Sequence, residues 1–362
     1  MLQLNNITLV QFRNYLSQSF SFNKKVVGIC GLNGTGKTNL LDAIYYLSFT
    51  KSYFGRTDAQ NVHQGLAGLR IEGHYHLNNQ AQELICIVRE NNKKEFLINE
   101  TVYKKFSDHI GNYPCVMIAP DDVELITGSS ELRRKFLDTI LSQIDSSYLQ
   151  ALIAYNKIIL QRNSLLKQAN EIGSIDNALL NIYNDQLIEK GNYIFEARVN
   201  FTKELLPLII HYYTKIATQS DDVELAYNSQ LTNQSFNKLL NENLSKDIAL
   251  QRTTTGIHKD DVVITMNANS FKNQASQGQR KSLLFAFKLA EWQLLKQKKG
   301  FAPILLLDDV FEKLDATRMF NLLTWVCKED DGQVFITDTH KERLSLALTE
   351  ANIAFQLIEL EA

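Results

Sequence analysis

The sequence predicts an α/β protein with a helical segment inserted into it, and three observations carry this prediction. The apolar run "KVVGIC" (25–30) leads into the glycine loop "GLNGTGKT" (31–38) and then into an apolar helical pattern. A second apolar run, "PILLL" (303–307), stops at two acids. Between them, from about residue 130, apolar side chains recur at helical spacing over about 90 residues. Strands followed by helices are typical of an α/β fold, and the uninterrupted helical part indicates an insertion.

Length and composition set the outer limits of the prediction. At 362 residues the chain is long for one compact core, so we expect two structural regions. Its 44% hydrophobic and 22% charged residues are typical of a globular protein. The formal net charge of −2 offers no overall attraction to nucleic acid, so any DNA contact needs a local basic patch.

Cysteine usage and hydropathy predict a cytoplasmic protein. The four cysteines show no paired spacing and lie mostly in apolar runs, which is typical of reduced core residues: Cys30, Cys86, Cys115 and Cys327. No apolar run is long enough to cross a bilayer, and the first residues lack a secretory signal pattern. We therefore expect no membrane partner.

The chain begins and ends with strand-like segments. Turn residues separate the alternating or apolar stretches of the first part: "NITLVQF" (6–12), "SFSF" (19–22), "KVVGICG" (25–31), "LRIEGHYHL" (69–77), "ELICIVRE" (83–90), "KEFLINE" (94–100) and "PCVMIAP" (114–120). The last part alternates strand and helix patterns: "DVELAYN" (222–228), "DDVVITM" (260–266), a helix over 278–297, then "PILLLDDV" (303–310), "QVFITD" (333–338) and "AFQLIEL" (354–360).

The middle of the chain has a helical texture. From 130 to about 220 there is one proline, Pro207, and two glycines, Gly173 and Gly191. Apolar residues recur there at helical spacing: Leu141, Ile144, Tyr148, Leu152, Tyr155, Ile159, Leu180, Tyr183, Leu187, Leu205, Ile209, Tyr213 and Ile216. We predict a discontinuous α/β head over 1–125 and 219–362, with an inserted helical domain over 126–218.

The glycine loop has the Gly-x4-Gly-Lys-Thr spacing of a phosphate-binding loop. Its glycines allow successive backbone N–H groups to turn toward phosphate oxygens at the positive end of a helix. Lys37 adds charge against the β- and γ-phosphates, and the Thr38 hydroxyl can bind Mg²⁺. The predicted nucleotide contacts in this loop are Gly31, Leu32, Asn33, Gly34, Thr35, Gly36, Lys37, Thr38 and Asn39.

Two carboxylates end the apolar strand "ILLLDD", the arrangement of a Walker B motif. We expect Asp308 to hold Mg²⁺ together with Thr38, directly or through water. Asp309 then orients or deprotonates the attacking water, so Asp309 and Lys37 are the predicted catalytic residues.

A third element, "ASQGQRKSLLFAFKLAE" (275–291), begins a long helix about 30 residues before the two acids. Its Ser276, Gly278 and Gln279 are similar to the Ser-x-Gly-Gln signature of ABC-type ATPases. In that superfamily the signature closes over the γ-phosphate bound by a second subunit, and Leu314 and Asp315 stand where the D-loop crosses the dimer interface. The resemblance implies an ABC-type ATPase head, with mixed β-sheets around the phosphate loop and an α-helical lid.

Within this superfamily the chain resembles the RecF family over nearly its full length. The matching segments are "LVQFRNY" (9–15), the glycine loop and its helix (31–53), "APDDVELITGSSELRRKFLD" (119–138), "TGIHKDD" (255–261), "SQGQRKSLLFAFKLAE" (276–291) and "LLLDDVFEKLD" (305–315). The segments around Arg133 and around His258 are not general ABC features, so they carry the family assignment.

The resemblance implies an ATP-dependent, DNA-binding protein of recombinational repair and replication restart, with a role in the SOS response. It implies a homodimer formed on ATP and Mg²⁺, a weak DNA-stimulated ATPase used as a switch, and non-sequence-specific binding at junctions of single- and double-stranded DNA. The implied partners are the mediators RecR and RecO and, indirectly, RecA. It also implies that Arg13 and Asn14 approach the nucleotide from the first strand.

Two departures from the superfamily pattern limit these expectations. Many ABC ATPases have Glu where this chain has Asp309, and the histidine that usually follows the next strand is replaced by Thr337 and Asp338. His340 lies two residues too late, and we do not assign it to the γ-phosphate. Candidate DNA contacts come from scattered cations: Lys51, Arg56, Lys104, Lys105, Arg133, Arg134, Lys135, Lys296, Lys298 and Lys299.

Two alternatives remain open on the residues alone. The nucleotide-binding subunit of an ABC transporter would share the loop and the signature, but transporters carry them much closer together than Thr38 and Ser276 stand here. A small-molecule P-loop kinase would leave the signature and "KLDATR" (313–318) without a purpose.

Overall fold

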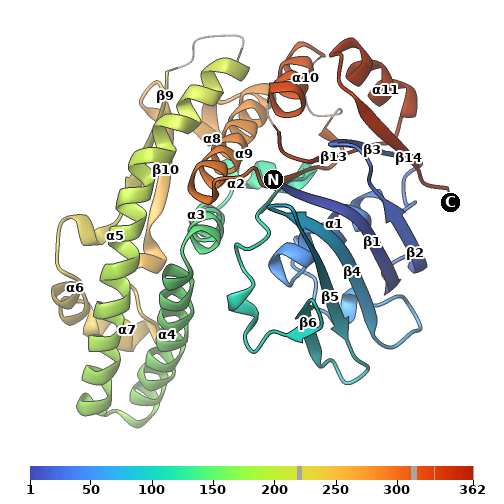
Figure 1. Cartoon of the computed structure of the whole chain (residues 1–362). Helices are drawn as coiled ribbons and strands as arrows, with labels where there is room; N and C mark the ends of the chain where they lie inside the picture. Colours follow the sequence, from blue (N-terminus) through green and yellow to red (C-terminus); the bar gives the residue numbers. More distant parts are fainter. Residues whose placement is uncertain (218–221, 311–315, 330, 362) are drawn as a thin grey trace. The chain divides into compact units, whose positions relative to one another are not determined.

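The computed structural model describes residues 1–217, 222–310, 316–329 and 331–361, and their contacts divide the chain into two compact units. The first unit comprises residues 1–123, 212–219 and 277–362, and the second comprises 124–211 and 220–276. Figure 1 gives the labels of the elements in each unit.

Two sheets organise the first unit. An antiparallel six-stranded sheet has the order β2-β1-β4-β5-β6-β7, and a parallel five-stranded sheet has the order β14-β3-β13-β12-β8. The antiparallel sheet consists of β1 (Leu2–Phe12), β2 (Tyr15–Ser21), β4 (Leu69–Leu77), β5 (Gln80–Val88), β6 (Lys94–Ile98) and β7 (Thr101–Val102). The parallel sheet consists of β3 (Val26–Cys30), β8 (Cys115–Ile118), β12 (Ile304–Leu307), β13 (Val334–Asp338) and β14 (Phe355–Glu359).

Helix α1 (Lys37–Phe49) forms the centre of the first unit. It contacts β4 and β5 of the antiparallel sheet and β8 and β13 of the parallel sheet, as Figure 1 shows. Eleven of its thirteen residues are buried, because a helix between two sheets has almost no solvent face. The other helices of this unit are α9 (Gln277–Lys299), α10 (Ala316–Leu323), a π-helical turn (Thr324–Glu329) and α11 (Lys341–Glu350).

Three strands of the parallel sheet, β3, β8 and β12, are apolar throughout, which is typical of strands covered on both faces. All five residues of β3 and all four of β12 are buried. By contrast β4 alternates, with Leu69, Ile71 and Tyr75 buried and Arg70 and His76 exposed. This is the pattern of a sheet with one face on the core and one in water.

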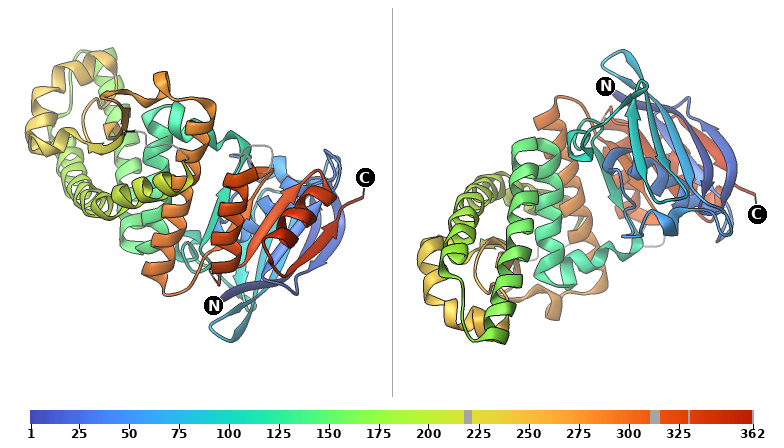
Figure 2. Two further views of the ribbon diagram at one scale, coloured as in Figure 1. Left: turned by 90° about the horizontal axis from the view of Figure 1, so that it is seen from above. Right: turned by 90° about the horizontal axis from the view of Figure 1, so that it is seen from below.

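Long helices dominate the second unit. Helices α4 (Ser146–Ile172) and α5 (Asn177–Ile216) lie side by side and antiparallel, joined by the hydrogen bonds Arg162–Asn184 and Tyr193–Asp145 (Figures 1 and 2). Shorter helices accompany them: α2 (Glu124–Thr127), α3 (Ser130–Ile144), α6 (Phe236–Glu242), α7 (Leu244–Leu250) and α8 (Phe271–Gln274). The helical spacing of the sequence therefore predicted the texture of this region correctly.

A small antiparallel sheet of order β11-β10-β9 also belongs to the second unit, with β9 (Val223–Asn228), β10 (Asp261–Met266) and β11 (Asn269–Ser270). This differs from the predicted boundaries, which returned the chain to the head at residue 219. The strands are where we expected them, but β9 and β10 pair with each other and β10 packs on α3. Within the described residues, no helix has the length and apolarity required to span a membrane.

Candidate nucleotide-binding site

The glycine loop lies between β3 and α1, and at two of its glycines there is no space for a Cβ atom. Gly31 has φ 155° and Gly36, at the start of α1, has φ 107°. A Cβ on Gly31 would lie 2.6 Å from the carbonyl oxygen of Leu360, and one on Gly36 would lie 2.5 Å from Nδ2 of Asn14. The loop is therefore drawn tightly against its neighbours, with the amides of the first turn of α1 at its end.

The Lys37 side chain is held against the loop backbone. Its Nζ donates to the carbonyls of Gly31 at 2.8 Å and Leu32 at 3.0 Å, and the residue is only 5% exposed. The Thr35 hydroxyl donates to the same Leu32 carbonyl at 2.9 Å, and Asn14 Nδ2 donates to the Thr35 carbonyl at 3.1 Å. An ammonium group fixed inside a glycine loop at a helix start is suited to a phosphate chain.

Thr38 and Asp308, far apart in sequence, meet beneath the loop. The Thr38 hydroxyl lies 3.0 Å from both Asp308 oxygens, and the Thr337 hydroxyl donates to Asp308 Oδ1 at 2.8 Å. Because β12 pairs in parallel with β8 and β13, the carboxyl ends of these strands lie at one edge of the sheet. Asp308 follows β12 there, and Thr337 lies near the end of β13. Burial raises the pKa of Asp308 to about 6; the hydrogen bonds from Thr337 and Thr38 and the charge of Lys37 offset only part of this rise, and the charge of Asp309 adds to it.

The same donor set fits Mg²⁺. Carboxylate and hydroxyl oxygens are the ligands that this ion prefers, and it uses one or two protein groups together with phosphate oxygens. A cation near Asp308 would also offset the cost of burying its charge. The residues that would hold the ion are Thr38 and Asp308, the two that the sequence pattern indicated.

Asp309 follows with an unusual backbone. Its φ is 45°, in the left-handed region that residues other than glycine rarely adopt, and its N–H donates to the Thr337 hydroxyl at 2.9 Å. Asp is among the residues that tolerate this conformation. Thr337 thus contacts both acids, and it is the site residue that sequence reasoning did not assign; its place at the end of β13, beside β12, was the available signal.

The first turn of the chain, between β1 and β2, places Arg13 and Asn14. The Arg13 guanidinium donates to Asn39 Oδ1 at 2.6 Å, to Asn61 Oδ1 at 3.1 Å, and to Asp42 and Ser52. Asn39 in turn donates to Asn14 Oδ1 at 2.7 Å. Arg13 is 9% exposed and is hydrogen-bonded to α1, and the implied approach of Arg13 and Asn14 to the nucleotide stays a prediction.

A buried polar chain continues from Asp42 to α9. Asp42 Oδ1 accepts from the Tyr53 N–H at 2.7 Å, and the Tyr53 hydroxyl donates to Asp122 at 2.6 Å. Lys288 Nζ lies 3.4 Å from the Tyr53 hydroxyl and 3.5 Å from Glu291. Burial raises the pKa of Glu291 to about 6. This chain links the helix of the glycine loop with the helix that follows the signature.

The signature residues lie at the start of α9. Ser276 is exposed directly before the helix, and Gly278 and Gln279 occupy its first turn and are partly buried. A helix N-terminus with a serine beside it can receive an anion. The boundary between the two units falls between Ser276 and Gln277. Leu314 and Asp315, the predicted D-loop, lie outside the described residues.

His340 lies two residues beyond the end of β13. His340 is exposed, and its N–H donates to Asp338 Oδ1 at 2.7 Å ahead of α11. Asp338 is buried and accepts from Arg343 Nε at 2.9 Å.

Arg133, a candidate DNA contact in the second unit, is bound to both oxygens of Asp261 at 2.7 and 3.0 Å and to the carbonyls of Leu125 and Gly128.

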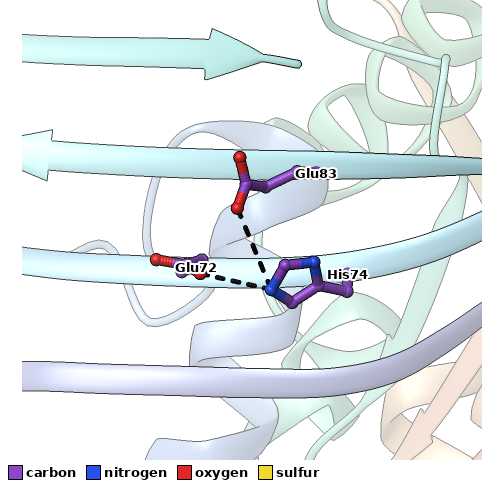
Figure 3. A group of neighbouring side chains, drawn as sticks. All are labelled: Glu72, His74 and Glu83. Carbon is purple, nitrogen blue, oxygen red and sulfur yellow. Dashed lines mark hydrogen bonds and ion pairs between the residues drawn. The ribbon is translucent and has the colours of Figure 1, made fainter. Parts of the chain in front are cut away.

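A separate polar cluster lies on the outer face of the antiparallel sheet (Figure 3). His74 Nε2 lies 3.2 Å from Glu72 and 3.9 Å from Glu83 across the strand pair, a grouping with the composition of a metal site. However, Arg70 donates twice to the remaining oxygen of Glu72, at 3.1 and 2.5 Å. A cation already neutralises this carboxylate, so we interpret the cluster as a cross-strand ion group.

Comparison with known proteins decides the family. Residues 3–358 match the family model described as the RecF/RecN/SMC N terminal domain. The DNA replication and repair protein RecF of Flavobacterium johnsoniae is 42% identical over 99% of this chain and 100% of that protein. The chain belongs to the RecF family. RecF of Cytophaga hutchinsonii is 40% identical over 95% of this chain and 91% of that protein.

Solved structures agree with this assignment to the RecF family. A structure of the recombination mediator protein RecF with ATP, in the RecFOR pathway, is 30% identical with a TM-score of 0.87, covering 94% of this chain and 92% of that chain. The Smc head domain from Pyrococcus furiosus, 14% identical with a TM-score of 0.57 over 100% of this chain and 94% of that chain, shares the fold. The predicted α/β head with a helical insertion is thus confirmed. Membership of the RecF family also favours the repair reading over the transporter and kinase alternatives.

Proposed function

We propose that this chain is an ATP-dependent DNA-binding protein of recombinational repair and replication restart. The observation that carries the proposal is the meeting of Thr38, Asp308 and Thr337 beneath the glycine loop, where the hydroxyls of both threonines are hydrogen-bonded to the buried carboxylate. The RecF relatives named above, described as DNA replication and repair proteins, supply the biological setting.

The nucleotide of this site is ATP with Mg²⁺, which supplies a transferable phosphoryl group and the metal charge that stabilises it. The loop amides from Gly31 to Asn39 and the Lys37 ammonium bind the phosphates, while Thr38 and Asp308 hold the metal. Asp309 orients or deprotonates the attacking water. Arg13 and Asn14 approach the nucleotide from the first strand, and their hydrogen bonds to Asn39 and Thr35 join them to the glycine loop and its helix.

A variant pair separates binding from turnover. Lys37→Ala removes a charge-assisted contact worth roughly 1.5–3 kcal/mol, so ATP affinity falls about tenfold or more. Asp309→Asn keeps a residue that tolerates the left-handed backbone, binds ATP, and stalls before hydrolysis. Titration of a fluorescent ATP analogue and a phosphate-release assay measure the two steps. Hydrolysis by Asp309→Asn at the wild-type rate would remove the general-base assignment.

The signature supports an ATP-dependent homodimer. Ser276, Gly278 and Gln279 of one subunit close over the γ-phosphate held by the other, so ATP with Mg²⁺ drives association and ADP does not. Light scattering under saturating ATP, under ADP and without nucleotide tests this. A monomer under all three conditions overturns the shared-site arrangement.

We further propose that the dimer is a slow, DNA-stimulated ATPase that acts as a switch. Its DNA partner is the junction of single- and double-stranded DNA at gaps, its protein partners are RecR and RecO, and its output is RecA loading and SOS induction. A short aspartate as base, with threonine instead of histidine at the end of β13, suits slow hydrolysis. Titration of labelled gapped DNA with ATP, ADP or no nucleotide tests the switch; equal affinity in all three refutes it.

A further inference from the structure

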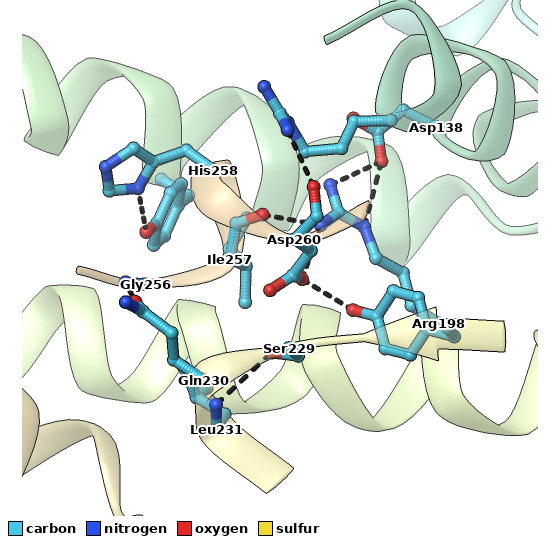
Figure 4. Close-up of polar contacts among 12 residues, drawn as sticks. Asp138, Arg198, Ser229, Gln230, Leu231, Gly256, Ile257, His258 and Asp260 are labelled. Carbon is cyan, nitrogen blue, oxygen red and sulfur yellow. Dashed lines mark hydrogen bonds and ion pairs between the residues drawn. The ribbon is translucent and has the colours of Figure 1, made fainter. Parts of the chain in front are cut away.

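The loop from Arg252 to Asp260 in the second unit is held rigidly by buried contacts, several of which Figure 4 shows. Asp247 Oδ1 accepts from the N–H and the hydroxyl of Thr254 at 2.9 and 2.6 Å. At the other end, Arg198 Nη1 donates to the Ile257 carbonyl at 2.8 Å and to Asp260 at 2.9 Å. The backbone is therefore fixed from both sides.

This loop gathers cations that are scattered in sequence. His258 Nε2 is hydrogen-bonded to the carbonyl oxygen of Thr253 at 3.0 Å. Arg252 directly precedes Thr253 and Lys259 directly follows His258, so this one hydrogen bond brings the two cations near each other. From α3, Arg134 Nη1 donates to the carbonyl of Asp260 at 2.6 Å, directly after Lys259. Arg252 and Lys259 are exposed, and Arg134 is partly buried.

The carboxylates of this neighbourhood are already paired with other arginines. Asp247 is bound to Arg162 at 2.7 Å, Asp260 to Arg198 at 2.9 Å, and Asp261 to Arg133 at 2.7 Å. The charges of Asp261, Asp260 and exposed Glu131 attract Arg134 without an ion pair, and burial and the charge of Arg198 still lower its pKa. Throughout the described parts of the chain, no carboxylate forms an ion pair with Arg134, Arg252 or Lys259.

Lys259 is repelled by both of the other cations. Burial lowers the pKa of Lys259, the positive charges of Arg252 and Arg134 lower it further, and the charge of Asp247 offsets part of this. A protein surface that holds like charges together on a rigid loop is stabilised by an anion that lies across them. Long exposed cations of this kind contact the phosphates of nucleic acids and position them without reading their sequence.

We propose that Arg134, Arg252 and Lys259 form a docking point for the phosphodiester backbone of DNA on the second unit. The proposal rests on the DNA-binding function proposed above and assigns it a place. Of the three residues, only Arg134 was a candidate on sequence grounds. Arg133, its neighbour, is committed to Asp261 and serves to hold α3 against β10.

The test uses the full-length chain and a labelled duplex with a single-stranded gap, titrated at several salt concentrations with ATP and Mg²⁺. Arg252→Ala and Lys259→Ala each remove one phosphate contact, so the slope of log affinity against log salt falls by about one, and affinity at about 0.1 M salt falls about tenfold. The double variant loses about two units of slope. Lys157→Ala is the matched control.

Lys157 is exposed on α4, two residues from buried Tyr155 and so on another side of the helix. Its variant keeps the wild-type slope, and all variants keep the wild-type unfolding temperature and ATP affinity. If wild type binds the gapped duplex and the double variant has the same slope as wild type, the docking point is refuted while the DNA-binding function stands. If wild type binds no DNA with any nucleotide, both fail.

Discussion

Asp308 in the first unit and Asp260 in the second are both buried carboxylates, but the charges of their partners differ. Asp308 is bonded to the hydroxyls of Thr38 and Thr337, and burial raises its pKa to about 6. Asp260 is bonded to the Arg198 guanidinium at 2.9 Å and to the Tyr227 hydroxyl at 2.5 Å. One carboxylate has neutral partners and the other has a buried cation.

The difference between these partners distinguishes a buried carboxylate that is suited to bind a cation from one that stabilises the fold. A buried charge without a counter-charge is costly, so it persists where a cation or substrate will complete it. A buried carboxylate paired with an arginine also has a desolvation cost, and it becomes strongly destabilising when the arginine is removed. Asp247, paired with fully buried Arg162, repeats the second case. The predictions below test this contrast.

The largest effect is expected from Arg198→Met, which leaves Asp260 buried without its counter-charge. The change also removes the ion pair with Asp138 and the hydrogen bond to the Ile257 carbonyl. We expect a loss of about 3–5 kcal/mol in the free energy of unfolding of the second unit. Hydrogen exchange of α5 and residues 253–260 measures it. The double variant Arg198→Met, Asp260→Asn should recover part of the loss; a cost below about 1 kcal/mol for the single change contradicts the contrast.

Acid should weaken both units through one histidine in each whose pKa is lowered. Burial lowers the pKa of His258 to about 4, and likewise that of His109 in the first unit. Above about pH 6.5 both the folded and unfolded states carry neutral imidazole, so these groups add no slope. Between 6.5 and 4 only the unfolded state binds the proton, and each unit loses up to about 3 kcal/mol before the loss levels off.

His258→Gln tests this pH dependence in one unit. The glutamine amide can still donate to the Thr253 carbonyl, but it has no proton to take up. Hydrogen exchange at pH 7, 6 and 5 should show a flatter loss of protection in the second unit and an unchanged loss around His109. The same slope in both units after the substitution would show that the pH dependence has another source.

Asp308→Asn should have opposite effects on stability and binding. The amide oxygen still accepts from Thr38 and Thr337, while the buried charge is gone, so the unfolding temperature is unchanged or higher. Mg²⁺-dependent affinity for ATP falls by about 2 kcal/mol, roughly thirtyfold, because a metal ligand is lost. Thermal unfolding measures the stability, and ATP titration with and without Mg²⁺ measures the affinity. If Asp308→Asn lost as much stability as Arg198→Met, the two carboxylates would not differ in the way proposed.

The smallest effect is expected from Tyr53→Phe, within the polar chain between α1 and α9. The change removes the hydrogen bond to Asp122 at 2.6 Å and the contact with Lys288, and costs about 1–2 kcal/mol. Tyr193→Phe removes a hydrogen bond to Asp145 at 3.0 Å on the surface of the second unit and should cost less. Urea unfolding compares the two variants. Equal losses in the free energy of unfolding would show that burial of the polar chain between α1 and α9 adds nothing to stability.

The sequence by itself determined the local machinery of the first unit. The glycine loop, the strand before it and the helix after it are contiguous, and β4 occupies the predicted residues 69–77. The pairing of Thr38 with Asp308 also followed from sequence, because parallel strands bring their carboxyl ends to one edge. Patterns of this kind are short-range or depend on one topological rule, so the order of residues is sufficient to express them.

Tertiary structure decided which unit each segment joins and which charges are free. The strands β9 and β10 have the same alternation as strands of the head, but they pair with each other, and register depends on partners that alternation does not name. Arg133 and Arg134 are adjacent in sequence, yet one is bound to Asp261 and the other lies beside Lys259. A side chain's charge becomes available or committed only when distant carboxylates are placed around it, because Coulomb attraction depends on separation in space and not along the chain.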